Sequence, residues 1–195
     1  MNISLTKDTL TPDLRRKLLA VGRPRTVFEA GAKAVQVEIS RHLKRLESRG
    51  NAMGWPSQHF FFGKADSVEK RVGIAALTDT GARIAIADPR FVHRIVGGTV
   101  AAKRRKYLAI PLTAQAYALS GQGSLRQAAA GLEVRFPFLG YEQPDGSFDP
   151  WFLLRQSVTH RAHPDEAPDK DELGRAAGKA MRRVVNLLLR ARGTT

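Results

Sequence analysis

The stretch "TVFEAGAKAVQVEISRHLKRLESR", from Thr26 to Arg49, decides the fold of this 195-residue chain. Apolar residues recur along it at helical spacing, on one face; they are Phe28, Ala32, Val35, Ile39, Leu43 and Leu46. Thr26 and Glu29 form a capping-box pattern for the helix start, and Gly50 is a stop signal. The stretch therefore predicts a long amphipathic helix whose charged outer face includes Glu38.

Shorter signals surround this helix. Residues 2–6 predict a strand, and Thr11 followed by Pro12 predicts the cap and first residue of a short helix that Gly22 and Pro24 end. Residues 71–89 read as a β-hairpin around the turn "TDTG". Further strand candidates occupy residues 107–112, 132–140 and 151–160, the last two around the reversal signal Pro144-Asp145-Gly146.

The C-terminal segment predicts another helix. Asp169 is placed as its cap, and the apolar stripe is Leu173, Ala177, Ala180, Val184, Leu187 and Ala191. The order of elements predicts an α+β fold: N-terminal helices including the long amphipathic one, an antiparallel β-sheet with hairpins, and a C-terminal helix. We expect one domain, with an N-terminal extension (1–24), a helix-plus-sheet core (25–160), and a linker with the C-terminal helix (161–195).

Composition limits the partners. Lys and Arg number 32 against 18 Asp and Glu, for a net charge of +14, which favours nucleic acid, acidic protein surfaces or anionic lipid. There are no cysteines, so disulfides and thiolate metal sites are excluded. The N-terminus lacks a signal-peptide pattern, and no apolar stretch approaches the roughly 20 residues of a spanning helix. We expect a soluble protein of the cytoplasm, or of a particle assembled there, with no membrane partner.

A basic run is the first candidate site: Lys103, Arg104, Arg105 and Lys106 stand between Gly97-Gly98 and the strand-like residues 107–112. One interpretation is a solvated, charged turn. The other is a basic loop that projects from the sheet toward DNA or an acidic neighbouring subunit. Gly97-Gly98 indicates a sharp reversal or a close backbone approach.

An aromatic segment, "GWPSQHFFFG" at residues 54–63, is the second candidate. Trp55, His59, Phe60 and Phe61 either pack as a lid over the sheet or form a partner-docking surface. A third interpretation is that these rings stack on nucleic-acid bases. The sequence supports it less, because basic and aromatic residues are not interleaved within the segment.

Catalytic signatures are absent from the sequence: there is no G-x-S-x-G elbow, Walker loop or G-x-G-x-x-G. His160 and His163 have H-x-x-H spacing, which suits a solvated linker or half of a metal site, but no second cluster of ligands accompanies them. We predict no enzyme activity, no catalytic residue, no cofactor and no metal.

Three segments together carry a resemblance to a known family. They are "NAMGWPSQHFF", "FVHRIVGGTVAAKRRKYLAIPL" and "FLLRQSVTHRAHPDEAPDKDELGRAAGKAM". The chain, from Thr26 to Ala191, resembles tailed-bacteriophage virion morphogenesis proteins of the tail-completion and neck kind. The resemblance implies a ring-forming homo-oligomer in the tail or neck region of the virion, assembled in the host bacterial cytoplasm. Its partners would be connector, tail-terminator or tail-tube subunits, with non-specific contact to packaged DNA.

Two hypotheses of different classes follow. The first is a structural assembly protein that completes the head-proximal end of the tail or the head–tail neck. The alternative is a sequence-independent nucleic-acid-binding protein, whose affinity would fall steeply with salt.

Overall fold

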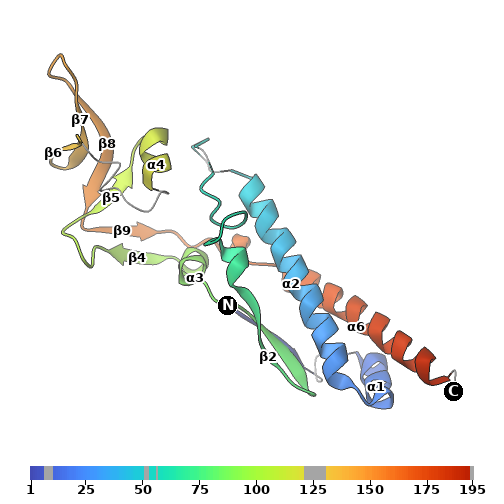
Figure 1. Ribbon diagram of the computed structural model, residues 1–195. Helices are drawn as coiled ribbons and strands as arrows, with labels where there is room; N and C mark the ends of the chain where they lie inside the picture. The colour runs from blue at the N-terminus through green and yellow to red at the C-terminus, as the bar shows by residue number, and fades with distance from the viewer. Residues whose placement is uncertain (7–10, 51–52, 56, 121–130, 194–195) are drawn as a thin grey trace. The chain divides into compact units, whose positions relative to one another are not determined.

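The computed structural model describes residues 1–6, 11–50, 53–55, 57–120 and 131–193. The fold is α+β, as predicted, with a long N-terminal helix, antiparallel sheets with hairpins and a C-terminal helix (Figure 1). We expected one domain, and the chain divides into two compact units. The first comprises residues 1–48, 59–92 and 164–195, and the second residues 49–58 and 93–163.

Three helices build the first unit: α1 (Pro12–Val21), α2 (Pro24–Ser48) and α6 (Lys170–Gly193). Helices α2 and α6 run side by side (Figure 1). The six residues of the predicted apolar stripe of α2 are all buried, with at most 4% of each side chain exposed. The periodicity of the sequence therefore placed the core face of α2 correctly.

A three-stranded antiparallel sheet completes this unit. Its strands are β1 (Asn2–Thr6), β2 (Val72–Leu77) and β3 (Gly81–Ile86), in the order β1-β3-β2. The predicted strand at residues 2–6 and the predicted hairpin are both confirmed. Ile84 and Ile86 are buried, whereas a β-bulge between Ile74 and Ala76 shifts the register of β2. A short 3-10 helix, η2 (Val68–Arg71), leads into β2, and another, η3 (Pro164–Glu166), precedes α6.

The start of α2 differs from the prediction. Pro24 was read as part of the stop of the preceding helix, but it is the first residue of α2. Proline is favoured at that position because the first helical N–H needs no partner within the helix. Thr26 therefore lies inside the first turn and is not the cap. Glu29 does not reach back to it and instead pairs with Lys33, one turn on, at 2.6 Å.

Helix α6 starts as predicted but carries a different apolar stripe. Asp169 Oδ1 accepts hydrogen bonds from the backbone N–H groups of Asp171 (2.7 Å) and Glu172 (3.2 Å), which makes it the N-cap. The buried residues are Leu173, Ala177, Met181 and Val185. The predicted stripe departed from this line after Ala177, and its Leu187 is 56% exposed.

The second unit contains two sheets. A four-stranded antiparallel sheet has the order β5-β8-β7-β6, and a two-stranded ribbon pairs β4 with β9. The strands are β4 (Gly98–Ala101), β5 (Leu108–Pro111), β6 (Glu133–Arg135), β7 (Phe138–Glu142), β8 (Phe148–Arg155) and β9 (Ser157–His160). Each of the predicted segments 132–140 and 151–160 therefore holds parts of two strands. The predicted reversal at Pro144-Asp145-Gly146 joins β7 to β8.

Two helices flank these strands in the chain. Helix α3 (Pro89–Val96) contains the boundary between the units, and α4 (Ala114–Ser120) follows β5. The Thr113 hydroxyl accepts a hydrogen bond from the N–H of Ala116 (3.1 Å) and so caps α4. Ala116 and Phe152 of β8 are fully buried, so α4 covers one face of the four-stranded sheet.

Shortening single side chains to alanine tests which face of α6 is buried. Met181 is 1% exposed, so we expect Met181→Ala to lower the free energy of unfolding by about 2–5 kcal/mol through reduced burial and a residual cavity. Leu187→Ala is the matched control on the same helix and should change it by less than about 0.5 kcal/mol. Urea denaturation followed by circular dichroism measures both. Equal destabilisation at the two positions would contradict this register.

Candidate functional site

The basic run forms an excursion between two strand ladders, one in each sheet of the second unit. Strand β4 pairs with β9 and strand β5 pairs with β8, so β4 and β5 lie against consecutive parts of one long partner segment. The Ala102 N–H donates to the Gln156 carbonyl (2.9 Å), and Leu108 is already opposite Arg155. Residues 102–107 therefore separate β4 from β5, whereas only Gln156 separates β8 from β9 on the partner segment. Figure 1 shows this excursion as the turn between β4 and β5.

The four cationic side chains of this excursion are exposed, and none forms an ion pair with any described residue. Among the described contacts of these four side chains with aromatic rings, the one present is that of Lys106, whose Nζ is 5.5 Å from the centroid of the Tyr107 ring. Arg155, opposite Leu108, is also exposed and has no carboxylate partner in the described part of the chain. The charge of the loop is thus not neutralised locally.

Gly97 makes the close backbone approach that the Gly97-Gly98 pair indicated. Gly97 has φ +76°, and a Cβ at that position would lie 2.7 Å from the backbone nitrogen of Ala162. The His163 N–H donates to the Arg94 carbonyl (3.0 Å) beside it. A side chain at Gly97 would push these two crossing segments apart, so this position needs glycine.

The aromatic segment divides between the units. Trp55 belongs to the second unit, where its ring centroid is 5.1 Å from that of Tyr117 on α4. Gln58 donates to the backbone carbonyl of Tyr117 and to the Ser120 hydroxyl, which ties the segment to the same helix. His59, Phe60 and Phe61 belong to the first unit. The four residues therefore do not form one cluster within a unit.

Phe61 lies in the core of the first unit. It is 9% exposed, and its ring packs edge-on against those of Phe60 (4.9 Å) and Phe91 (6.3 Å). The N–H groups of Phe61 and Phe62 both donate to Glu47 Oε2. His59 is exposed, with φ 55°.

A buried carboxylate supports this aromatic packing. Asp88 is 1% exposed and pairs with Arg90 Nη2 at 2.7 Å and Arg71 Nε at 3.4 Å. Arg90 in turn lies 5.3 Å from the centroid of the Phe60 ring. Burial raises the pKa of Asp88, but hydrogen bonds from the Arg90 side chain and from the N–H groups of Arg90 and Phe91 outweigh it and lower that pKa below its usual value.

One aromatic pair beside the basic run was not singled out from the sequence. Tyr107, at the end of the excursion, has its ring centroid 5.4 Å from that of Phe136, which is 66% exposed. The two residues are far apart in the chain, so no local pattern joins them. The signal that the sequence offered was an aromatic residue directly before Pro137, and the structure places it in the turn between β6 and β7.

The two histidines of the H-x-x-H pattern do not contact each other through their rings. The ring of His160 lies edge-on to that of His93 at 5.6 Å, and His163 forms no ring contact with either. Nε2 of His93 is buried and has no hydrogen-bond partner within the described residues. That part of the chain contains no group of three or more His, Cys, Asp or Glu side chains able to hold a metal ion.

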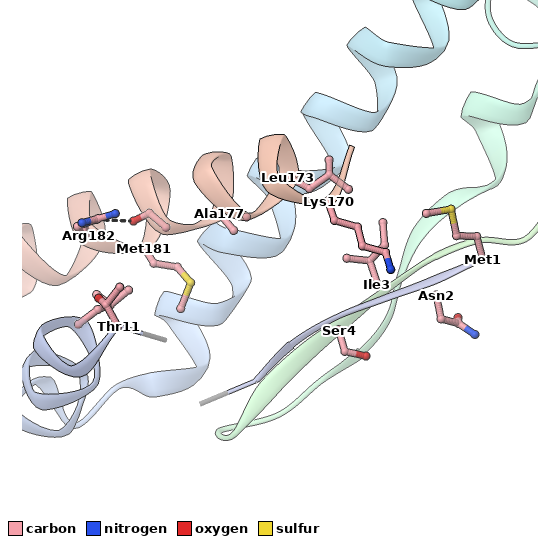
Figure 2. Close-up of a pocket in the computed structure, with 13 residues that line it drawn as sticks. Met1, Asn2, Ile3, Ser4, Thr11, Lys170, Leu173, Ala177, Met181 and Arg182 are labelled. Atoms are coloured by element: carbon pink, nitrogen blue, oxygen red, sulfur yellow. Dashed lines mark hydrogen bonds between the residues drawn. The ribbon is translucent and has the colours of Figure 1, made fainter. Parts of the chain in front are cut away.

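A cavity of about 520 Å³ lies in the first unit between β1, the start of α1 and α6 (Figure 2). Its lining is mainly apolar, with Ile3, Leu14 and Met181 among the contributors, and Lys170 and Arg182 add two cations. The Arg182 side chain donates to the Gly178 carbonyl (3.3 Å). The described lining holds no carboxylate or histidine, so it presents no acid–base pair.

Neither a protein-family model, nor a curated protein, nor a solved structure matches this chain. In the described ranges, no helix has the length and apolar character needed to cross a membrane.

The role of Asp88 predicts a pH-dependent stability difference. Because its folded-state pKa is lowered, its contribution to stability is complete above the ordinary pKa of about 4 and disappears as the pH falls through the folded-state value. We expect Asp88→Asn to lower the free energy of unfolding by roughly 1–3 kcal/mol at neutral pH. The difference in the free energy of unfolding between the variant and the wild type should become smaller below about pH 4.

Urea titrations from pH 7 to about pH 3 measure this difference, with Asp79→Asn, in the exposed turn between β2 and β3, as control. If the difference in the free energy of unfolding stayed constant over the whole pH range, the Asp88 charge would not stabilise the protein through Arg90 and Arg71.

Proposed function

We propose that this chain is a structural assembly protein of a tailed bacteriophage, a ring-forming subunit that completes the head-proximal end of the tail or the head–tail neck. The resemblance of residues 26–191 to virion morphogenesis proteins supports the proposal. The observation that carries it is the β4–β9 ribbon, whose two edges are not bonded to any other described strand.

The open edge of β4 has a defined chemistry. The Ala102 N–H donates to the Gln156 carbonyl, and along an antiparallel ladder the residues whose backbone groups face the partner strand alternate with residues whose groups face away. Val100 therefore bonds to its partner in β9, whereas the N–H and C=O groups of Thr99 and Ala101 point away from it. Unpaired backbone groups on an exposed edge can accept a strand from another chain. Repeated head-to-tail pairing of identical subunits closes into a ring when the rotation allows it.

This function implies a set of partners and a location. The subunit would form a homo-oligomeric ring that contacts connector, tail-terminator or tail-tube proteins. It would reside in the tail or neck region of the virion after assembly in the bacterial cytoplasm. It would act by binding and not as an enzyme, and non-specific contact with packaged DNA would involve its basic surface.

The unpaired charge of the basic run favours a second candidate, a sequence-independent nucleic-acid-binding protein. Lys103 to Lys106 are exposed and lack ion pairs among the described residues, so phosphates could approach them without displacing a carboxylate. Such binding follows counterion release and falls with rising salt.

The edge-pairing proposal can be tested with Ala101→Pro. Proline at this position removes an outward N–H and leaves the inward ladder bonds intact, so the subunit should still fold. We expect the wild type to form a discrete oligomer, alone or on its phage partners, and the variant to remain monomeric. Sedimentation velocity and electron microscopy of the purified protein and of the particle fraction measure this.

Ala101→Ser is the matched control, because it keeps the N–H and should assemble normally. Circular dichroism establishes that both variants are folded. A wild type that stays monomeric under all conditions and never appears in particles would refute the assembly function. Normal assembly of folded Ala101→Pro would refute only the role of this edge.

A further inference from the structure

We propose that the end of the four-stranded sheet that carries the basic excursion is a binding surface for single-stranded nucleic acid. There, Lys103, Arg104, Arg105, Lys106 and Arg155 contact phosphates, and the Tyr107–Phe136 pair stacks on an unpaired base. This inference deepens the second candidate function and does not depend on the assembly proposal. We call this surface the basic–aromatic end.

The strand register brings these residues to one place. Leu108, directly after the excursion, is opposite Arg155 in β8. On the other side of β8, the Leu154 N–H donates to the Pro137 carbonyl (2.7 Å). Phe136 therefore lies level with Arg155, and its ring reaches that of Tyr107. Three separate segments of the chain thus supply cations and aromatic rings to the same end of the sheet.

The aromatic pair is arranged so that a further ring could join it. Lys106 Nζ is 5.5 Å from the Tyr107 centroid, and Tyr107 and Phe136 are in tilted contact at 5.4 Å. Phe136 remains 66% exposed, so most of its surface is open to solvent. A base placed against it would bury apolar area already flanked by cations, and base–aromatic stacking tolerates any base.

The carboxylates of this unit do not neutralise the basic–aromatic end. Glu142, Asp145 and Asp149 lie at the opposite end of the sheet, around the turn between β7 and β8. Glu133 is opposite Gly140, away from the β6–β7 turn that carries Phe136. Glu142 pairs with Arg135 (2.8 Å), and Asp149 accepts a hydrogen bond from the Trp151 indole (2.9 Å). Positive charge therefore gathers at one end of the sheet and negative charge at the other. This distribution attracts an anionic ligand to the basic–aromatic end.

The exposed ring of Phe136 favours single-stranded over double-stranded nucleic acid. Bases of a duplex are stacked on one another and present only their edges, so cations alone would engage its phosphates. An unpaired base has a free face, and the contact with Phe136 would then add to the phosphate contacts. An acidic protein would use the cations but would gain nothing specific from the aromatic pair.

The test measures binding of full-length protein to a fluorescent oligothymidylate of about 20 nucleotides, longer than one binding site, by anisotropy over a salt series. A duplex of the same length is the comparison. We expect tighter binding to the single strand. Phe136→Ala should weaken that binding about tenfold or more and leave the salt dependence unchanged, because it removes stacking but no charge. Phe136→Tyr should retain affinity.

Replacing the four residues Lys103 to Lys106 with Gln should instead lower the salt slope, by about 0.7 for each phosphate that the protein no longer neutralises. Val134→Ala, at a 65% exposed apolar residue of the same hairpin, is the matched control and should have no effect. Circular dichroism and thermal melting establish that every variant is folded.

Three other outcomes would contradict the proposal, and they can be told apart when heparin is included as a third anionic ligand. Equal affinity for both ligands, with Phe136→Ala unchanged, would mean that only charge acts and that stacking is absent. Binding to heparin with no binding to either nucleic acid would indicate a general polyanion site. No binding to any of the three would refute this surface and the second candidate function, and the assembly proposal would stand or fall on its own experiment.

Discussion

The packing of α6 against α2 is the contact on which the rest of the first unit depends. Helix α2 is buried both by α6 and by the three-stranded sheet, so it is the middle layer of the core. Polar contacts fix the alignment of the two helices: Glu38, which is 8% exposed, binds Arg45, and Arg45 also binds Glu172 of α6 at 3.2 Å. His42 Nε2 lies 2.9 Å from the Glu166 carbonyl, just before α6.

This alignment has a topological consequence, because most of the second unit is inserted between the parts of the chain that α2 and α6 bring together. The insertion leaves at His93 and returns at His163. The hydrogen bond from the His163 N–H to the Arg94 carbonyl joins its two ends, and the tight crossing at Gly97 holds them close. The strands between these points can therefore pair among themselves without disturbing the helical core.

The sequence predicted what local periodicity determines. The buried face of α2 and the β2–β3 hairpin follow from patterns within single segments, and both are confirmed. The stripe of α6 was wrong after Ala177, because three- and four-residue steps are equally acceptable in a helix. Tertiary packing of α6, against α2 and α1, selects Met181 and Val185. The sequence predicts Glu38 on the solvent face of α2, but the residue is buried. A charged residue is expected to be exposed, and the sequence does not show that Arg41 and Arg45 pair with it.

The candidate surfaces were predictable only in part, because pairing between distant segments creates them. The sequence showed the basic run but not that it leaves a ladder formed with a segment far along the chain, nor that Phe136 would lie beside Tyr107.

The two units also differ in how fully they are buried. Of the buried apolar side chains in the described ranges, only Ala116 and Phe152 belong to the second unit. An extensive core thus stabilises the first unit, whereas the second exposes strand edges, unpaired cations and an aromatic ring. Substitutions at Lys103 to Lys106 or Phe136 remove little buried area, so we expect them to change binding while the fold stays intact, whereas substitutions on the buried face of α2 would destabilise the fold.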